Sequence, residues 1–126
     1  MTRRPVLLAL VALAASLSGI WWIRRGDVRD VALRLAAAAP RDGAAAVGRS
    51  ALQALPAGTR AEHLVLAIAQ ALDADPAVIA EMPEHELRAR LRDRVAAEHR
   101  SGETLSVEGW ELALTEARLY ALAAAM

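Results

Sequence analysis

Three patterns of hydrophobic and polar positions divide this chain. An uncharged apolar run covers residues 5–23. Between residues 27 and 100, apolar residues recur every three or four positions, which is the period of an amphipathic helix. Between residues 103 and 114 they alternate with polar residues, which is the period of a strand buried on one face. The sequence therefore predicts a membrane-length segment, a helical region and a C-terminal hairpin.

The helical region is expected to form five helices joined by short loops. Their expected ranges are 27–39, 43–55, 61–72, 76–82 and 83–100. In the second helix, Gly48 suits close contact with another helix. The third is the best candidate for the centre of the core, because one face carries Leu64, Ile68 and Leu72. The fifth has a similar stripe, made of Leu87, Leu91 and Val95.

Capping residues indicate where these helices begin and end. Starts are predicted at Asp27 after a break at Gly26, at Asp42, at Thr59 with Glu62 in a capping box, at Asp75 ahead of Pro76, and at Pro83. For the first of these helices, continuation of the membrane helix without a break is the alternative. Stops are predicted at Pro40, Pro56 and Gly102.

The tail between residues 103 and 114 predicts two short strands around a turn at Glu108-Gly109. Glycine accepts a positive φ without steric cost, as tight hairpin turns require. The resulting register pairs Val107 with Trp110, Leu105 with Leu112 and Ser106 with Glu111, so that one face is apolar and the other polar. A continuous helix is the competing interpretation, and both Gly109 and the alternation disfavour it.

A terminal helix is expected over 115–125, with Thr115 as its cap and Glu116 in its first turn. The predicted fold is therefore mainly α. It consists of an N-terminal transmembrane or signal-anchor helix within residues 1–25, followed by one small helical bundle over 26–126 that ends in the hairpin and this helix.

The uncharged run 5–23 is long enough to cross a hydrocarbon core of roughly 30 Å as a helix. Trp21, Trp22, Arg24 and Arg25 follow it as expected membrane-interface residues. A retained signal-anchor is favoured over a cleaved signal, because the apolar run continues past the small residues around Ser18. A buried helix of a soluble protein is the remaining alternative.

The sequence predicts a single-pass protein of the bacterial inner membrane with a periplasmic C-terminal domain. Orientation is left open, since the arginines after the span outnumber Arg3 and Arg4 before it. Thr2 to Leu7 is similar to the twin-arginine export motif, although Val6 stands where that motif usually has an aromatic residue. The other interpretation is that Arg3 and Arg4 are simply the positively charged residues that often precede an apolar segment.

Composition narrows the possible functions. The chain has 15 basic and 15 acidic residues, so no overall field would recruit nucleic acid. It has no cysteine and therefore neither a thiolate nucleophile nor a cysteine metal site. Catalytic residues, cofactors and metal ligands are all predicted to be absent, and the chain is not expected to be an enzyme.

The ionisable residues support this expectation. Glu84, His85 and Glu86 are close in sequence, but neighbouring helical positions diverge by about 100° and do not converge on one ion. His63 and His99 lack a helical partner four residues on that would complete a zinc pair. A metal site assembled by tertiary contact from the three histidines is left open. A solvated helix face is favoured over an anionic partner or lipid surface for Arg88, Arg90, Arg92, Arg94 and Arg100.

The tail pattern GW-x-L-x-x-TEARL-x-AL, from Gly109 to Leu122, resembles the ending of a group of small bacterial cell-envelope proteins with no established activity. Where those proteins are expected to have Ser-x-Thr-Glu, this chain has Ala113 to Glu116. The resemblance implies a common fold and a shared partner, and it supplies no catalytic residue.

An isolated two-stranded hairpin is marginal in water, so its apolar face must be covered. The first interpretation is that the protein's own helices cover it. The second is that it docks on another protein through Leu105, Val107, Trp110, Leu112 and Tyr120.

Three functions are weighed. The first is a non-enzymatic, membrane-tethered accessory protein of the envelope that binds a larger partner through the hairpin and terminal helix. The second is a small subunit or maturation factor of an exported enzyme complex, routed by twin arginines. The third is an enzyme with an unrecognised site.

Overall fold

The computed structural model describes residues 25–39 and 44–126. The predicted span 5–23, with Trp21, Trp22 and Arg24, lies outside these residues, and so do the predicted boundaries Pro40 and Asp42. Within the described part of the chain, no helix is both long and apolar enough to cross a membrane.

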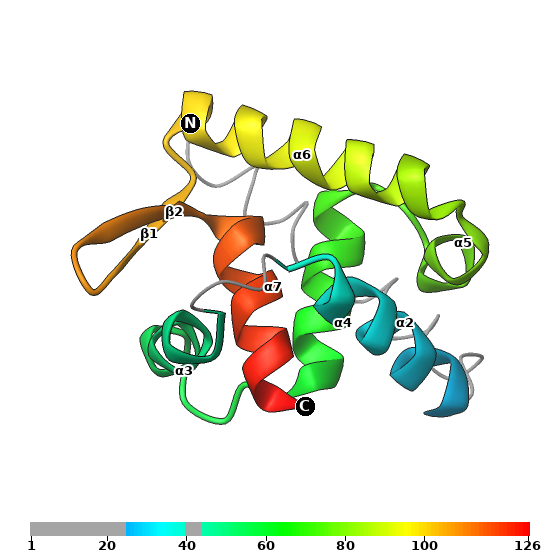
Figure 1. Ribbon diagram of the computed structural model, residues 1–126, viewed down its shortest axis with the longest axis horizontal. Coiled ribbons are helices and arrows are strands. Elements are labelled where there is room, and N and C mark those ends of the chain that lie inside the picture. The colour runs from blue at the N-terminus through cyan, green and yellow to red at the C-terminus, as the bar shows by residue number, and fades with distance from the viewer. Residues whose placement is uncertain (1–24, 40–43) are drawn as a thin grey trace, which may run out of the picture.

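Six helices and two strands make up the described domain (Figure 1). In chain order they are α2 (Arg25–Ala37), α3 (Ala44–Ala54), α4 (Ala61–Ala71), α5 (Pro76–Glu81), α6 (Glu84–Ser101), β1 (Thr104–Val107), β2 (Trp110–Ala113) and α7 (Leu114–Ala125). The prediction of a mainly helical fold with a C-terminal hairpin and a terminal helix is confirmed.

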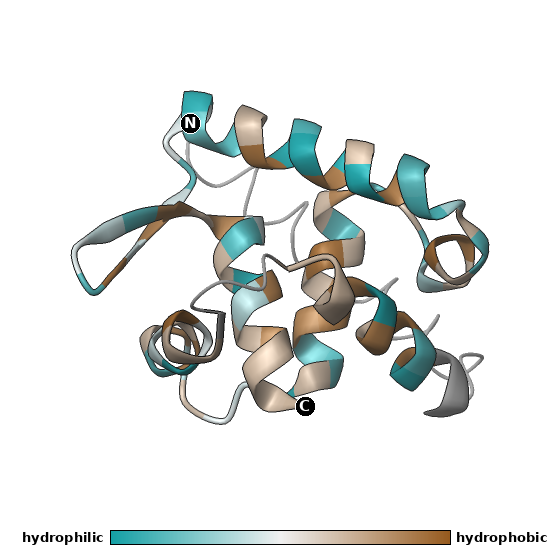
Figure 2. Ribbon diagram, viewed as in Figure 1, coloured by the Kyte–Doolittle hydropathy of each residue, from teal (hydrophilic) through white to brown (hydrophobic). Residues whose placement is uncertain are grey.

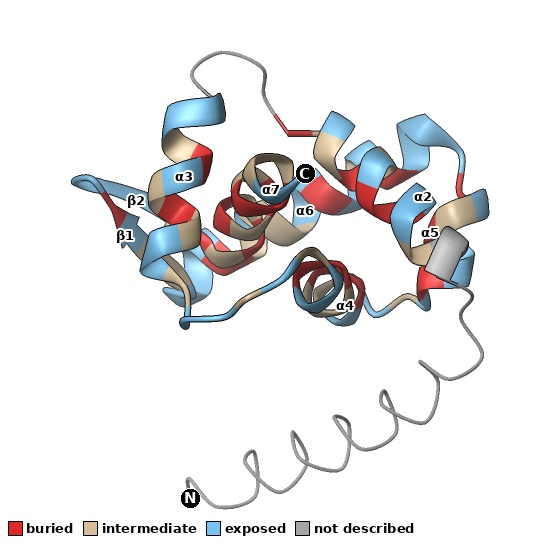
Figure 3. Cartoon of the chain, turned by 90° about the horizontal axis from the view of Figure 1, so that it is seen from below, coloured by how far each residue is buried: buried red, intermediate tan, exposed pale blue. Residues whose placement is uncertain are grey.

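The centre of the domain is α7. It contacts α2, α3, α4 and α6 as well as both strands. Figure 3 shows it in the middle of the domain with buried residues on several of its sides. The sequence favoured the helix over 61–72 for this place. That helix, α4, lies beside α7 as one of its neighbours (Figure 1).

The predicted apolar stripes form the core. Leu64, Ile68 and Leu72 are buried, and α6 contributes Leu87 and Leu91. Figure 2 shows hydrophobic residues on the side of α6 that faces α4 and α7, with polar residues on the other side. The amphipathic period therefore predicted the inward face of α4 and most of that of α6, where Val95, the third residue of the predicted stripe, is only half-buried.

Several predicted caps are confirmed. The Asp75 carboxylate accepts a hydrogen bond from the Ala77 backbone N–H at 2.9 Å, and Pro76 is the first residue of α5. Gly102 ends α6 in the left-handed conformation, with a φ of 78°. Pro83 precedes the first residue of α6.

Two predicted helix starts are wrong. The first residue of α4 follows Arg60, whose N–H donates to the His63 imidazole at 3.1 Å, while the Thr59 hydroxyl donates back to the Pro56 carbonyl. The Thr59–Glu62 box is therefore displaced by one residue, because the imidazole takes the role expected of the glutamate. Likewise α2 begins at Arg25 and includes Gly26 and Asp27, so the helix has no break at Gly26 and Asp27 is not its cap.

Arg34 joins α2 to the end of α5. Its guanidinium donates to the backbone carbonyls of Ile79 at 2.6 Å, Ala80 at 2.8 Å and Met82. The last carbonyl groups of a helix lack partners within the helix and carry partial negative charge. The arginine therefore supplies donors to the carbonyl groups at the C-terminal end of α5 and joins that end to α2.

Gly48 allows α3 to approach α7 closely. A Cβ atom at this position would lie 2.5 Å from the Tyr120 carbonyl oxygen and 3.0 Å from the Ala124 Cβ. Because the nearer atom belongs to a helix backbone, no side-chain rotation relieves the clash. The contact predicted for Gly48 is thus confirmed, and its partner is the terminal helix.

Replacing Gly48 with alanine is expected to destabilise the fold. Alanine is favoured over glycine in a helix by about 1 kcal/mol, but overpacking against α7 costs about 1–3 kcal/mol and should outweigh that gain. Chemical denaturation of the detergent-solubilised full chain measures the difference. Gln53→Ala, at an exposed position of the same helix, is the control. A Gly48→Ala variant more stable than the unchanged protein would contradict the close contact.

Candidate functional site

The C-terminal hairpin has the predicted register. Its pairs are Val107 with Trp110, Ser106 with Glu111, Leu105 with Leu112 and Thr104 with Ala113. Both turn residues have positive φ, 51° at Glu108 and 82° at Gly109. Two successive positive φ values give the turn whose twist matches that of the two strands. The turn at Glu108-Gly109 is therefore confirmed, with Glu108 in a conformation that costs a non-glycine residue energy.

The five residues proposed to bind a partner fall into three environments. Val107 is buried in the core, with 3% of its surface exposed. Three others are half-buried and pack against the core, namely Leu105, Leu112 and Tyr120. Trp110 stands apart, with 71% of its surface exposed. The domain's own helices thus cover most of the apolar face, and the largest side chain of the hairpin is left in solvent.

A hydrogen bond ties the turn to α3. The Ser50 hydroxyl donates to the Glu108 carboxylate at 2.6 Å, across 58 positions of sequence. The strand next to this turn, β1, also contacts α3, whereas β2 contacts α6. Figure 1 shows the hairpin projecting from the helical domain at this corner. The turn is therefore held against one helix while the Trp110 side chain remains exposed.

The base of the hairpin is fixed by Glu98 from α6. Its side chain is buried, with 1% exposed, and its carboxylate accepts hydrogen bonds from the Thr115 backbone N–H and the Thr115 hydroxyl, both at 2.7 Å. The prediction that Thr115 caps the terminal helix is wrong. Thr115 lies inside α7, and a glutamate from another helix binds the first turn instead. A carboxylate is favoured there because the N-terminal amide groups carry partial positive charge.

One arginine pairs with this carboxylate and a second lies within range of its charge. Arg94 Nε donates to Glu98 at 3.2 Å, and another of its nitrogens pairs with Glu103 at 2.9 Å. The pKa of Arg118 is lowered by burial, and the charges of Glu98 and Glu103 partly oppose this shift. Arg94 from α6 therefore pairs with both carboxylates at the base of the hairpin.

Backbone groups complete the base. The Glu103 N–H donates to the Glu98 carbonyl at 2.9 Å, and the Leu114 N–H donates to the Glu103 carbonyl at 3.0 Å. The Ser101 hydroxyl donates to the Glu103 carboxylate at 3.0 Å. These bonds close the chain on itself between the end of α6 and the start of α7, so the hairpin leaves the domain in a defined direction.

The three histidines lie in different places, and only His99 is next to the base of the hairpin. His63 accepts the amide hydrogen bond at the start of α4, His85 is exposed, and His99 lies 3.9 Å from Glu116. Among residues 25–39 and 44–126, no group of three His, Asp or Glu side chains is placed to hold a metal ion.

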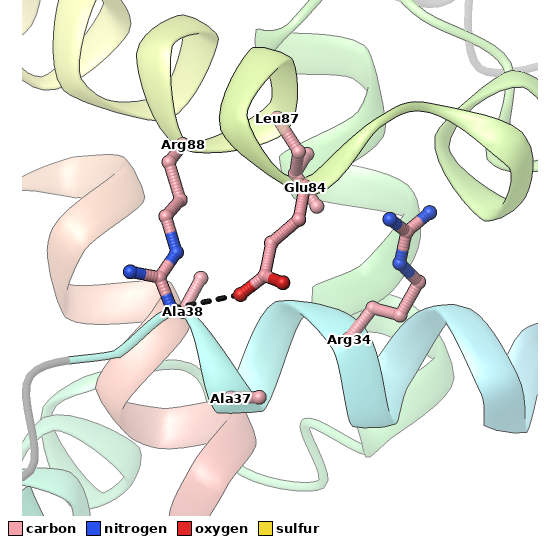
Figure 4. A pocket seen from close by; sticks show the side chains of 6 residues that line it. All are labelled: Arg34, Ala37, Ala38, Glu84, Leu87 and Arg88. Carbon is pink, nitrogen blue, oxygen red and sulfur yellow. Dashed lines mark ion pairs between the residues drawn. The ribbon is translucent and has the colours of Figure 1, made fainter.

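A hollow of about 210 Å³ lies between α2 and the start of α6. Figure 4 shows Arg34, Glu84 and Arg88 beside it, with Glu84 and Arg88 joined as an ion pair at 2.9 Å. The Arg34 guanidinium is occupied by the carbonyls at the end of α5. Both arginines at this hollow therefore already have partners.

Sequence reasoning missed Glu98. The sequence assigned the arginine-rich part of this helix to solvent and singled out no acidic residue there as buried. One signal could have found it: Glu98 follows Leu87 by eleven positions, which is close to three helical turns, and so lies on the buried stripe. A carboxylate on an apolar stripe indicates a buried partner.

Glu98→Ala is expected to destabilise the domain by about 2–3 kcal/mol, because it leaves the buried Thr115 N–H and hydroxyl without an acceptor. Glu86→Ala is the matched control. Glu86 also pairs with an arginine four residues on, at 3.3 Å, but both side chains are exposed. The control should cost at most about 0.5 kcal/mol.

Chemical denaturation of both variants in the full chain makes this comparison. A Glu98→Ala variant no less stable than Glu86→Ala would show that the buried contact contributes nothing. Thr115→Val, which keeps the backbone N–H and removes the hydroxyl, should fall between them at about 1 kcal/mol.

The chain was compared with protein-family models, with curated proteins and with solved structures, and none of them matches it. The resemblance of the tail to cell-envelope proteins stays a prediction. What the domain does must therefore be inferred from the hairpin and its surroundings.

Proposed function

We propose that this chain is a non-enzymatic, membrane-tethered accessory protein of the bacterial envelope, whose domain binds a larger protein through the hairpin. Residues 5–23 are its anchor. In the domain that follows the anchor, the hairpin presents Trp110 to the partner. The terminal helix α7 packs against both strands of the hairpin.

The exposure of Trp110 carries this proposal. Trp110 is 71% exposed and leaves a large apolar surface in water. Tryptophan is among the residues most enriched at the energetic centres of protein interfaces, where it fills a pocket and places its N–H at the rim. Docking into such a pocket would remove this apolar surface from water.

The way the hairpin is held supports the same function. Val107 packs in the core, the turn is bonded to Ser50, and the base is closed by the Glu98 contact with Thr115. Binding costs free energy when a loop must become ordered, and a prearranged loop avoids most of that cost. A hairpin fixed at its face, tip and base therefore suits recognition without rearrangement.

Trp110→Ala should abolish recovery of the partner while leaving the fold intact. The side chain is mostly exposed, so its removal is expected to change the free energy of unfolding by less than about 0.5 kcal/mol. The tagged full chain is purified from detergent-solubilised native membranes, and its co-purifying proteins are compared with those of Val78→Ala. Val78 is also an exposed large apolar residue, at 52%, but it belongs to α5.

A partner recovered equally with Trp110→Ala and with the unchanged chain would refute binding through the hairpin. Loss of the helical circular dichroism in Trp110→Ala would instead identify Trp110 as a residue that the fold requires.

The tether has a separate test. A retained anchor predicts that the mature protein begins at or near Met1, which N-terminal sequencing of the purified chain determines. A mature N-terminus near Gly19 would contradict the anchor. Together with co-purification of a folded enzyme, it would favour the exported subunit suggested by Arg3 and Arg4.

A further inference from the structure

All the charged residues of the hairpin segment 103–111 are acidic. Residues 103–111 include three glutamates and no basic residue, and all three glutamates are exposed. Only Glu103 has a cationic partner, Arg94. Glu108 and Glu111 take part in no ion pair within the described residues.

The hydrogen bonds of these two carboxylates come from uncharged donors, which do not neutralise them. Glu108 accepts from the Ser50 hydroxyl at 2.6 Å, and Glu111 accepts from the Thr104 hydroxyl at 2.7 Å. Both donors are neutral. They orient the carboxylates without balancing their charge. The exposed Trp110 lies between these two glutamates in the sequence.

This charge distinguishes three possible occupants of the tip. An anionic lipid surface would meet Glu108 and Glu111 as like charges, and so would a second hairpin of the same chain. A protein surface rich in arginine or lysine would meet them as opposite charges. Cations are also attracted to the face of an indole ring, and arginine stacks on it well.

We propose that the partner receives the tip of the hairpin in a basic recess, with a cationic side chain against Trp110 and further cations paired with Glu108 and Glu111. This inference rests on the proposed function and names the chemistry of its partner. Neighbouring residues of a strand point to opposite faces, so Trp110 and Glu111 lie on opposite sides of the hairpin. The recess must therefore reach both faces of β2 beside the turn, because a flat surface would reach only one of the two side chains, while the turn keeps its hydrogen bond to Ser50.

The test removes charge and keeps shape. Glu108→Gln with Glu111→Gln preserves the acceptor oxygens for Ser50 and Thr104, so the hairpin should remain folded. The matched control is Glu62→Gln with Glu81→Gln, which removes the same charge from exposed positions on α4 and α5.

The probe is the protein that co-purifies with the unchanged full chain and is lost with Trp110→Ala, after it has been identified and purified. Its affinity for each detergent-solubilised full-length variant is measured at low and high salt. The hairpin double variant is expected to lose about tenfold or more in affinity, and the control double variant should bind as the unchanged chain does. The association rate of the unchanged chain should fall as salt rises.

Each outcome decides a different question. Equal affinity of the two double variants, with association independent of salt, overturns the basic recess and leaves binding through Trp110 standing. If the material lost with Trp110→Ala is a second copy of this chain, or lipid alone, the partner is not a basic protein surface and the proposal is overturned. Failure to recover anything that depends on Trp110 overturns the recess and the proposed function together.

Discussion

The contact between Glu98 and Thr115 decides where the hairpin stands. The chain leaves α6, forms two strands and returns into α7, and this carboxylate joins the two helices at the point of return. Burying a carboxylate is costly unless it is paired and hydrogen-bonded. Here two donors from Thr115, the Arg94 side chain and the N-terminal end of α7 offset that cost. The most central helix of the domain thus begins at a charge supplied by another helix.

The hairpin depends on this arrangement. Two short strands alone are marginal in water, and this pair gains its stability from the helices around it. Val107 enters the core, Ser50 holds the turn, and the network at the base fixes the direction in which the strands leave the domain. What remains in solvent is the indole of Trp110 and the carboxylates beside it. The same contacts that stabilise the fold therefore present the surface that we propose binds a partner.

Local rules predicted much of this structure. The alternation of apolar residues and the Glu108-Gly109 turn gave the register of the hairpin, because both depend on neighbouring residues alone. The caps at Asp75 and Gly102 followed for the same reason. Thr115 was assigned as a cap by the same local preference, but a tertiary contact displaced it. Nothing in the pattern near Thr115 indicates that a glutamate 17 positions earlier would bind there.

The candidate site shows the same limit. Alternation placed Trp110 on the apolar face of the hairpin, opposite Val107. Pattern alone does not tell how far the core extends along the strands. Both residues flank the turn, but α3 packs against β1, the strand that carries Val107, and Trp110 on β2 is left exposed. The central place of α7 was also missed, because small alanine side chains give a weak hydrophobic signal while they permit the close contact at Gly48.

Photo-crosslinking in living cells tests the central claim most directly. A photoreactive phenylalanine derivative is placed at position 110 of the full chain, and in a second strain at position 78 on α5. The account predicts a discrete cross-linked product between position 110 and a larger protein, and none of that mass from position 78. The same product from both positions, or no protein product from position 110, would contradict the claim that the tip of the hairpin is a binding surface.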